Sequence, residues 1–247
     1  MHEPDLSHAQ KAYLARMKRG RRLVISARLL VFLIFTAQWE ILARIGWIDS
    51  FIFSSPSMIL KTFVEMSKDQ SLFIHISATL KETLLSFLFV VILGLGISIL
   101  LWGCKGLAKV LEPYLVILNS LPKSALAPLL IVWLGARQRT IIVAGMSVAI
   151  FGSILNLYTG FGEISPEKLK LIRTLGGGKR DELLKIVLPS CIPLILANMK
   201  VNIGLCLVGV IIGEFIGARK GLGYLIIYGS QTFQQVCILI VFQLILT

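Results

Sequence analysis

The chain consists of long apolar runs separated by short polar segments. A run of about 20 apolar residues can span a bilayer as a helix, and a segment in lipid must hydrogen-bond its own backbone. The pattern therefore predicts an all-α membrane protein with six transmembrane helices, the third broken by Pro122 and Pro128. The spans are expected at about 23–43, 80–102, 111–134, 139–160, 188–213 and from 232 to the end of the chain.

The polar segments define the rest of the organisation. Residues 1–22 form a polar tail without a small-residue cleavage site, so the first apolar run is a retained span rather than a signal peptide. Residues 45–78 mix charged and apolar positions, which favours an exposed connection with a short amphipathic helix after Pro56. The expected domains are the tail and one transmembrane domain, 23–247, that carries a polar loop at 161–186.

Composition supports the membrane assignment. The chain is 56% hydrophobic and 15% charged, whereas a soluble domain carries about 25% charged residues. The cysteines form neither a CxxC motif nor a cluster with histidine, which predicts packing thiols and no disulfide framework or metal site. They are Cys104, Cys191, Cys206 and Cys237.

The chain has a net charge of +12, and the positions of its basic residues predict its orientation in the membrane. The basic residues flank the apolar runs and form no stripe with aromatic residues, so a nucleic-acid partner is not indicated. Segments 1–22, 103–112 and 161–186 together hold fourteen basic residues, against six in the segments on the other side. Because cytoplasmic loops are enriched in Lys and Arg, the N-terminus and the 161–186 loop are expected in the cytoplasm.

The 161–186 loop has the pattern of a helix-turn-helix. Ser165 and Pro166 form a helix start, with Ser165 as the capping oxygen, and the glycines from Gly176 to Gly178 end that helix. Asp181 and Glu182 then open a second helix near its positive end. An apolar stripe on the first helix would need a protein groove, and it comprises Leu169, Ile172 and Leu175.

The spacing from Gly176 over nine residues to Ile186, followed by Leu188-Pro189, resembles the cytoplasmic loop signature of ATP-binding-cassette (ABC) importer permeases. The glutamate-alanine-alanine triplet of that signature is replaced by Lys-Leu-Ile at 170–172. Three further stretches resemble the nitrate/sulfonate/taurine branch of these permeases. They are FIFSSPSMIL (51–60), NSLPKSALAPLLIVWLG (119–135) and GEFIGARKGLGYLI (213–226).

The resemblance implies a type I ABC importer permease fold with a cytoplasmic coupling helix. It also implies four kinds of neighbour: a second permease subunit (a homodimer in preference to a heterodimer), two cytoplasmic ATPase subunits, an extracytoplasmic substrate-binding protein and membrane lipid. The chain would bind no cofactor, since ATP and Mg bind the ATPase. By the resemblance, the residues that contact the ATPase are Arg173, Thr174, Leu175, Gly176, Gly177, Leu188 and Pro189.

The chain lacks a phosphate-binding loop of its own. Such a loop needs Gly, four residues, Gly, Lys and Ser or Thr, whose backbone cradles the phosphates. Gly178-Lys179 matches only the end of this pattern, because Arg173 stands at the first glycine and Arg180 at the hydroxyl. The energy for transport is therefore expected from a separate subunit.

Two lysines within spans are candidates for the translocation pathway. A charge at the centre of a membrane helix costs about 2.5–3.5 kcal/mol, so Lys123 and Lys200 are expected to face the bundle interior and attract an anion. The alternatives are that Lys123 extends to the interface and that Lys200 is a buried packing cation. With their polar neighbours, the pathway candidates are Asn119, Ser120, Lys123, Ser124, Asn156, Lys200 and Asn202.

Small residues four apart near the end of the fifth span suggest close helix packing, within the chain or against a second permease. They are Gly209, Gly213, Gly217 and Gly221. Glu214 lies among them and is expected to pair with Arg219 or Lys220. No catalytic triad and no paired intramembrane carboxylates are apparent in the sequence.

The sequence thus favours a permease subunit of a bacterial inner-membrane importer, with a sulfonate, taurine or nitrate as cargo. A vitamin or vitamin precursor is the alternative cargo. A secondary transporter would show intramembrane carboxylates and inverted repeats, and a membrane enzyme would show a catalytic set. A further alternative is that residues 165–186 form only an amphipathic helix that lies on anionic lipid.

Overall fold

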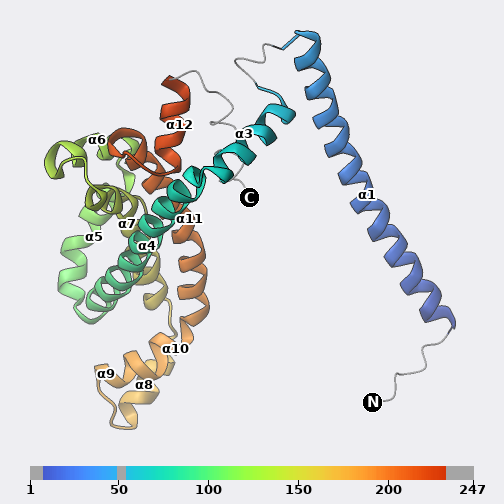
Figure 1. The fold of residues 1–247 in the computed structure, drawn as a ribbon. Coiled ribbons are helices and arrows are strands. Elements are labelled where there is room, and N and C mark those ends of the chain that lie inside the picture. The colour runs from blue at the N-terminus through green and yellow to red at the C-terminus, as the bar shows by residue number, and fades with distance from the viewer. Residues whose placement is uncertain (1–7, 49–53, 232–247) are drawn as a thin grey trace.

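The computed structural model describes residues 8–48 and 54–231, and every regular element within these ranges is a helix (Figure 1). Four of these helices are long and apolar enough to cross a membrane, and a bent helix pair makes up to five. The span expected from 232 onward lies outside the described residues, as do Cys237 and the start of the 51–60 stretch.

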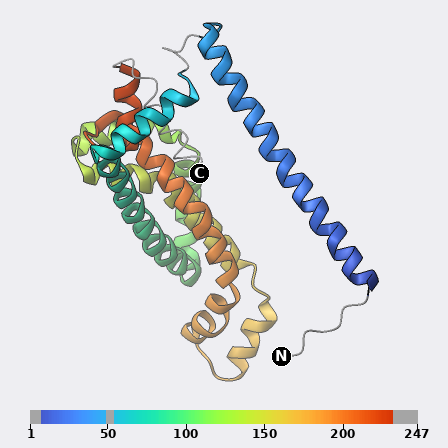
Figure 2. The ribbon, with the colours of Figure 1, turned by 45° about the vertical axis from the view of Figure 1, so that its right-hand side comes forward.

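The first helix, α1 (His8–Ile45), is longer than the span predicted at 23–43. Part of the predicted polar tail is therefore helical, from His8 onward. These residues are rich in Ala, Lys and Arg, which favour helix whether or not the helix lies in lipid. In both ribbon views α1 stands apart from the other helices (Figures 1 and 2).

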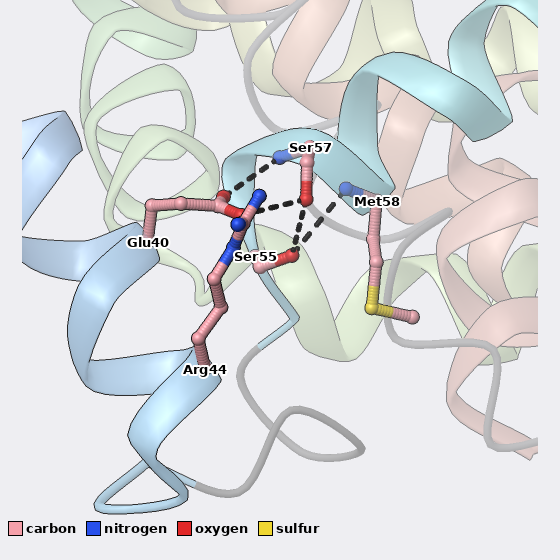
Figure 3. A network of polar contacts seen from close by, with 5 residues as sticks. All are labelled: Glu40, Arg44, Ser55, Ser57 and Met58. Carbon is pink, nitrogen blue, oxygen red and sulfur yellow. Dashed lines mark hydrogen bonds and ion pairs between the residues drawn. The ribbon is translucent and has the colours of Figure 1, made fainter.

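A polar joint connects the end of α1 to α3 (Pro56–Lys68), the short helix expected after Pro56 (Figure 3). The Glu40 carboxylate accepts hydrogen bonds from the Ser57 amide (3.1 Å) and the Ser57 hydroxyl (2.9 Å). Arg44 Nε donates to the same carboxylate at 2.8 Å, and Ser55 Oγ caps α3 by accepting from the Met58 amide. The joint fixes the position at which the chain leaves α1.

Three long helices form the centre of the bundle: α4 (Ser71–Gly103), α7 (Gln138–Gly162) and α11 (Ile192–Gly217). Small residues let their backbones approach, since a Cβ added at Gly209 of α11 would lie 2.8 Å from Gly145 Cα of α7. α4 begins at Ser71 rather than near 80, because no helix-breaking residue separates 71–79 from the apolar run.

The third predicted span is a pair of helices, α5 (Lys105–Ser120) and α6 (Lys123–Leu134), bent by 98° at Leu121–Pro122. The break expected at Pro122 is therefore confirmed. The break expected at Pro128 is wrong, because that residue continues within α6. It lies in the second turn, where a missing amide leaves only the Ser124 carbonyl unpaired, and Ser124 is exposed.

Short helices occupy the two ends of the bundle. At one end lie α8 (Pro166–Thr174), α9 (Lys179–Glu182), the π-helical turn η1 (Leu183–Val187) and α10 (Leu188–Ser190). At the other end α12 (Leu222–Gln231) follows α11 and packs against α3 and α4 (Figure 1). The apolar pattern left α12 unassigned because it is too short to span.

Candidate functional site

The turn between α8 and α9 requires two glycines for different reasons. Gly176 has a φ of +82°, a conformation that L side chains rarely adopt. Gly177 donates its amide to Ile172 O at 2.9 Å, and a Cβ at this position would meet Ile172 and Asp181. Glycine at 176 supplies the sharp reversal, and glycine at 177 lets α9 pack against α8.

An ion pair between buried Glu182 and exposed Arg173 braces this turn. Glu182 is 2% exposed and accepts hydrogen bonds from the guanidinium of Arg173, one from Nε and one from Nη2. The Arg173 hydrogen bond lowers the pKa of Glu182, and in return it raises the pKa of Arg173. The Gly178 amide donates to Asp181 Oδ2 (3.1 Å), which caps α9. The turn is therefore held by contacts within a few residues of sequence.

Two local expectations for the 161–186 loop need correction. Ser165 occupies the N-cap position, but its side chain makes no capping hydrogen bond, because its backbone (φ −50°) is not the extended one of a capped start. The stripe expected to face a partner is divided: Leu169 packs against the core of Leu157 and Phe161, whereas Leu175 is 77% exposed.

The residues expected to contact the ATPase differ in exposure, because some lie at the tip of the turn and others at its base. Arg173, Thr174, Leu175 and Gly176 are exposed, and Gly177 is half-buried beneath them. Leu171, which the sequence reasoning omitted, is 60% exposed and belongs to the same surface. Leu188 packs against the core at the base, next to exposed Pro189. The tip is thus an exposed, partly apolar knob on a packed base.

Lys123 does not reach the other pathway candidates on α7 and α11. Its ammonium donates to the backbone carbonyls of Asn119 and Leu118, which end α5 without intrahelical partners. The Ser120 hydroxyl bonds within its own helix, and Ser124 is exposed. These residues gather at the α5–α6 bend and stabilise it.

A polar seam joins α7 to α11 inside the bundle. Asn198 Nδ2 and Asn202 Nδ2 both donate to Ser153 Oγ, at 2.7 and 3.0 Å, and Asn156 Nδ2 donates to Asn198 Oδ1 at 3.2 Å. Lys200 is exposed and does not belong to the seam.

Of the seam's four residues, the sequence reasoning singled out Asn156 and Asn202 but missed Ser153 and Asn198. The spacing of 198 and 202, four apart on one helix face, is the signal that would have found Asn198.

At the opposite end, Glu214 ties three segments together. It is 1% exposed and accepts hydrogen bonds from Thr79 Oγ1 (2.7 Å) and the Gly223 amide (2.6 Å). Thr79 in turn accepts from the Leu222 amide, and the Gly221 amide donates to His75 Nδ1 at 3.0 Å. α4, α11 and the start of α12 therefore meet at one carboxylate.

This geometry corrects two expectations about Glu214. Within the described residues it forms no ion pair with Arg219 or Lys220, because the chain turns after Gly217 and both cations are exposed. Its carboxyl instead contacts that of Glu82 in α4, which is 4% exposed. A pair of buried carboxyl groups that the linear sequence did not reveal thus lies at this end of the bundle.

The glycines spaced four apart contact helices of the same chain. Gly209 lies against Ala144 and Gly145 of α7, and Gly213 lies against Ile141 of the same helix. Gly217 faces Ile131 of α6, and the next glycine, Gly221, lies beyond the end of α11 against Glu214. In this structure the row packs α11 onto α7 and α6.

Residues 91–246, more than half of the chain, match the family described as "Binding-protein-dependent transport system inner membrane component". The chain belongs to this family. The match includes the knob, the polar seam and the Glu214 end.

Relatives agree with this assignment. The chain is 28% identical over 203 residues to the putative aliphatic sulfonates transport permease protein SsuC of Bacillus subtilis (strain 168), covering 82% of this chain and 74% of the relative. It is 29% identical over 196 residues to the formylaminopyrimidine transport permease protein ThiX of Halalkalibacterium halodurans, covering 79% and 77%.

The taurine transport system permease protein TauC of Escherichia coli (strain K12) is 22% identical over 217 residues, covering 85% of this chain and 78% of the relative. The prediction of an ABC permease of the nitrate/sulfonate/taurine branch, a transporter subunit rather than an enzyme, is confirmed by the family and these relatives.

Proposed function

We propose that this permease forms the translocation pathway of an ATP-driven importer and that the 161–186 loop couples it to a separate ATPase. The observation that carries the proposal is the knob: Leu171 and Leu175 are exposed on a turn that Arg173 and Glu182 brace from behind. Exposed leucines at the tip of a braced turn suit a protein groove, which would bury them. A rigid knob can also transmit a push to α7 and α11, between which it lies.

The assembly we infer contains two permease subunits, in a homodimer in preference to a heterodimer, two cytoplasmic ATPases and an extracytoplasmic binding protein. In this arrangement the fold is the type I importer permease fold with six spans, the last at 232–247. The N-terminus and the knob face the cytoplasm of a bacterial cell, as the distribution of basic residues favours. Glu214 and α12 then lie toward the outer face.

For the cargo we favour a small oxyanion, such as a sulfonate, taurine or nitrate. The names of the relatives support this class, since they include aliphatic sulfonate, taurine and nitrate permeases. A second candidate is a vitamin or its precursor, which the formylaminopyrimidine and riboflavin permeases among the relatives favour. The seam of Ser153, Asn156, Asn198 and Asn202 offers neutral hydrogen-bonding groups to either cargo.

Copurification of the partner ATPase with the full-length permease tests the proposal. Gly176→Arg places a bulky cation on the knob at a φ of +82°, and Gly135→Arg is a matched control at a φ of +79° beyond α6. Both positions have open space, so any strain is similar. We expect Gly176→Arg to lower ATPase recovery about tenfold and Gly135→Arg to leave it unchanged. Equal recovery with both variants would refute docking at the knob.

A further inference from the structure

A cleft of about 810 Å³ lies behind the knob, between α8 and α9 on one side and the adjoining ends of α4, α5 and α7 on the other. Its inner wall is apolar and is formed by Leu101, Phe161, Ile164 and Leu169. Trp102 and Tyr158 add aromatic surface to the same wall. The cleft is therefore separate from the seam and from the exposed Leu171 and Leu175 of the knob, although Arg173 of the knob lines it.

The rim of this cleft carries an excess of positive charge. Five basic and two acidic side chains line it, and one acid, Glu182, already pairs with Arg173. Within residues 8–48 and 54–231, Lys105, Lys109 and Lys170 form no ion pair. Three positive charges thus remain in excess around an apolar wall, and an anion would compensate them.

The position of the cleft in the bundle favours an anionic lipid over a free inorganic ion. Trp and Tyr are enriched at membrane–water interfaces, and basic pockets between helices on the cytoplasmic side bind anionic lipid headgroups. A free inorganic ion would use the lysines but leave the apolar wall in contact with water. A phospholipid would use both, with its phosphate at the rim and part of an acyl chain on the partly exposed Ile164 and Leu169.

We propose that this cleft binds the headgroup of an anionic phospholipid, with Lys105, Lys109 and Lys170 as its phosphate ligands. The proposal rests on the proposed function for the cytoplasmic position of the knob. The lipid would fill the space between the knob and α5 and connect the two with charge-assisted hydrogen bonds. It differs from adsorption of the loop on a membrane surface, because the ligand lies behind the knob and leaves the tip free.

Native mass spectrometry of the full-length permease, with dioleoyl-phosphatidylglycerol and dioleoyl-phosphatidylcholine as probes, tests this proposal. The test variant is Lys105→Gln with Lys109→Gln. The control, Lys61→Gln with Lys68→Gln, removes the same charge from exposed lysines of α3 at the other end. We expect retention of phosphatidylglycerol to fall about tenfold in the test variant and to stay within about twofold in the control. Phosphatidylcholine retention should be the same in both.

Two outcomes would overturn the proposal. Equal loss of phosphatidylglycerol from both variants would indicate general attraction to a basic protein. Displacement of phosphatidylglycerol by inorganic phosphate alone would indicate a small-anion site. The thermal unfolding midpoint in phosphatidylcholine should be unchanged, which shows that the variants are folded.

ATPase copurification from the same samples separates the two proposals. Lipid selectivity that survives in a permease unable to bind the ATPase would count against the proposed function alone. ATPase binding without lipid selectivity would count against the cleft alone.

Discussion

A buried glutamate lies at each end of the helical bundle, and the two are stabilised in opposite ways. Glu182, beneath the knob, is paired with Arg173 only nine residues earlier in the chain. Glu214, at the α12 end, accepts hydrogen bonds from Thr79 of α4, 135 residues away, and from the Gly223 amide, with Glu82 beside it. One acid is balanced locally by a cation, whereas the other is held by neutral donors from distant segments.

The difference indicates what each end can do. Because the brace of the knob is local, the 161–186 loop can move as a unit without losing its internal contacts. Because Glu214 joins α4, α11 and α12, any motion that separates these helices must break its hydrogen bonds. The knob end is thus suited to transmit motion, and the Glu214 end is suited to resist it. A variant of Glu214 should therefore destabilise the whole bundle, whereas a variant of Glu182 should disturb the knob alone.

The largest effect is expected from Glu214→Leu. The substitution leaves Thr79 Oγ1 and the Gly223 amide buried without an acceptor, at a cost of about 3 kcal/mol in the free energy of unfolding. SDS-induced unfolding of the purified permease measures the loss. Glu214→Gln keeps an acceptor oxygen and should lose about half as much.

A control at α3 makes the Glu214 result specific. Glu65 is an exposed carboxylate, and Glu65→Leu should change the free energy of unfolding by less than about 0.5 kcal/mol. A Glu214→Leu variant as stable as Glu65→Leu would contradict the role of Glu214 as a tie between helices.

The second-largest effect is expected at the knob and should leave the stability of the bundle unchanged. Glu182→Ala removes the partner of Arg173, so the knob loses its brace while the bundle keeps its packing. We expect ATPase copurification to fall about tenfold and SDS-induced unfolding of the bundle to stay unchanged.

Asp181→Asn is the control for Glu182→Ala, because it removes the charge that pairs with exposed Lys185 but keeps an oxygen that can accept from the Gly178 amide. It should lower ATPase recovery less than about twofold. Global unfolding by Glu182→Ala would show that the knob is not an independent unit.

Between the two ends, the polar seam should contribute less. Asn198→Ala removes the hydrogen bonds to Ser153 and Asn156, and we expect a loss of about 1 kcal/mol in the free energy of unfolding. Ser147→Ala is the control, since its hydroxyl bonds only to Ala144 O within α7. If both variants unfold at the same SDS concentration, the seam does not hold α7 to α11.

The smallest effect concerns pH. The pKa of Glu182 lies below its ordinary value of 4.5 because Arg173 donates to it, so the ion pair stabilises the folded knob above about pH 4.5. That stabilisation is lost as the pH falls through the lowered pKa, where the carboxylate becomes protonated. Hydrogen exchange of residues 165–188 from about pH 6 to about pH 3 should show this loss of protection. Glu182→Gln should reduce the pH dependence to the part that comes from Asp181, whose pKa is lowered by hydrogen bonds from Lys185 and the Gly178 amide.

Much of the helical framework could be predicted from the sequence. The run predicted at 139–160 is α7, Gln138–Gly162, and the bend at Pro122 follows from a residue that cannot donate an amide. The extension of α1 to His8 was missed because hydropathy reports the lipid-facing part of a helix and not where the helix ends. Pro128 was misjudged because a proline inside a helix removes one backbone hydrogen bond without necessarily ending the helix.

The candidate site could also be predicted from the sequence only in part. The Gly176 turn could be predicted because it depends on the conformation of one residue. The partners of Glu214 could not, since Arg219 and Lys220 are near in sequence but the turn after Gly217 carries them away from the buried carboxyl. The roles of Lys123 and Lys200 also depended on helix rotation, which places one at the end of α5 and the other on an exposed face.

By itself, the sequence determined that the protein is helical with several long apolar helices, which residues form the turn of the knob and to which family the chain is related. These properties depend on the length of apolar runs and on residues adjacent in the chain. Only the tertiary structure decided which polar groups meet: Glu214 with Thr79 and Glu82, Ser153 with Asn198 and Asn202, and the lysines around the cleft. Hydrophobic burial sets the position of a helix, but hydrogen bonds and charges act over a few ångströms, and packing alone brings their distant partners into that range.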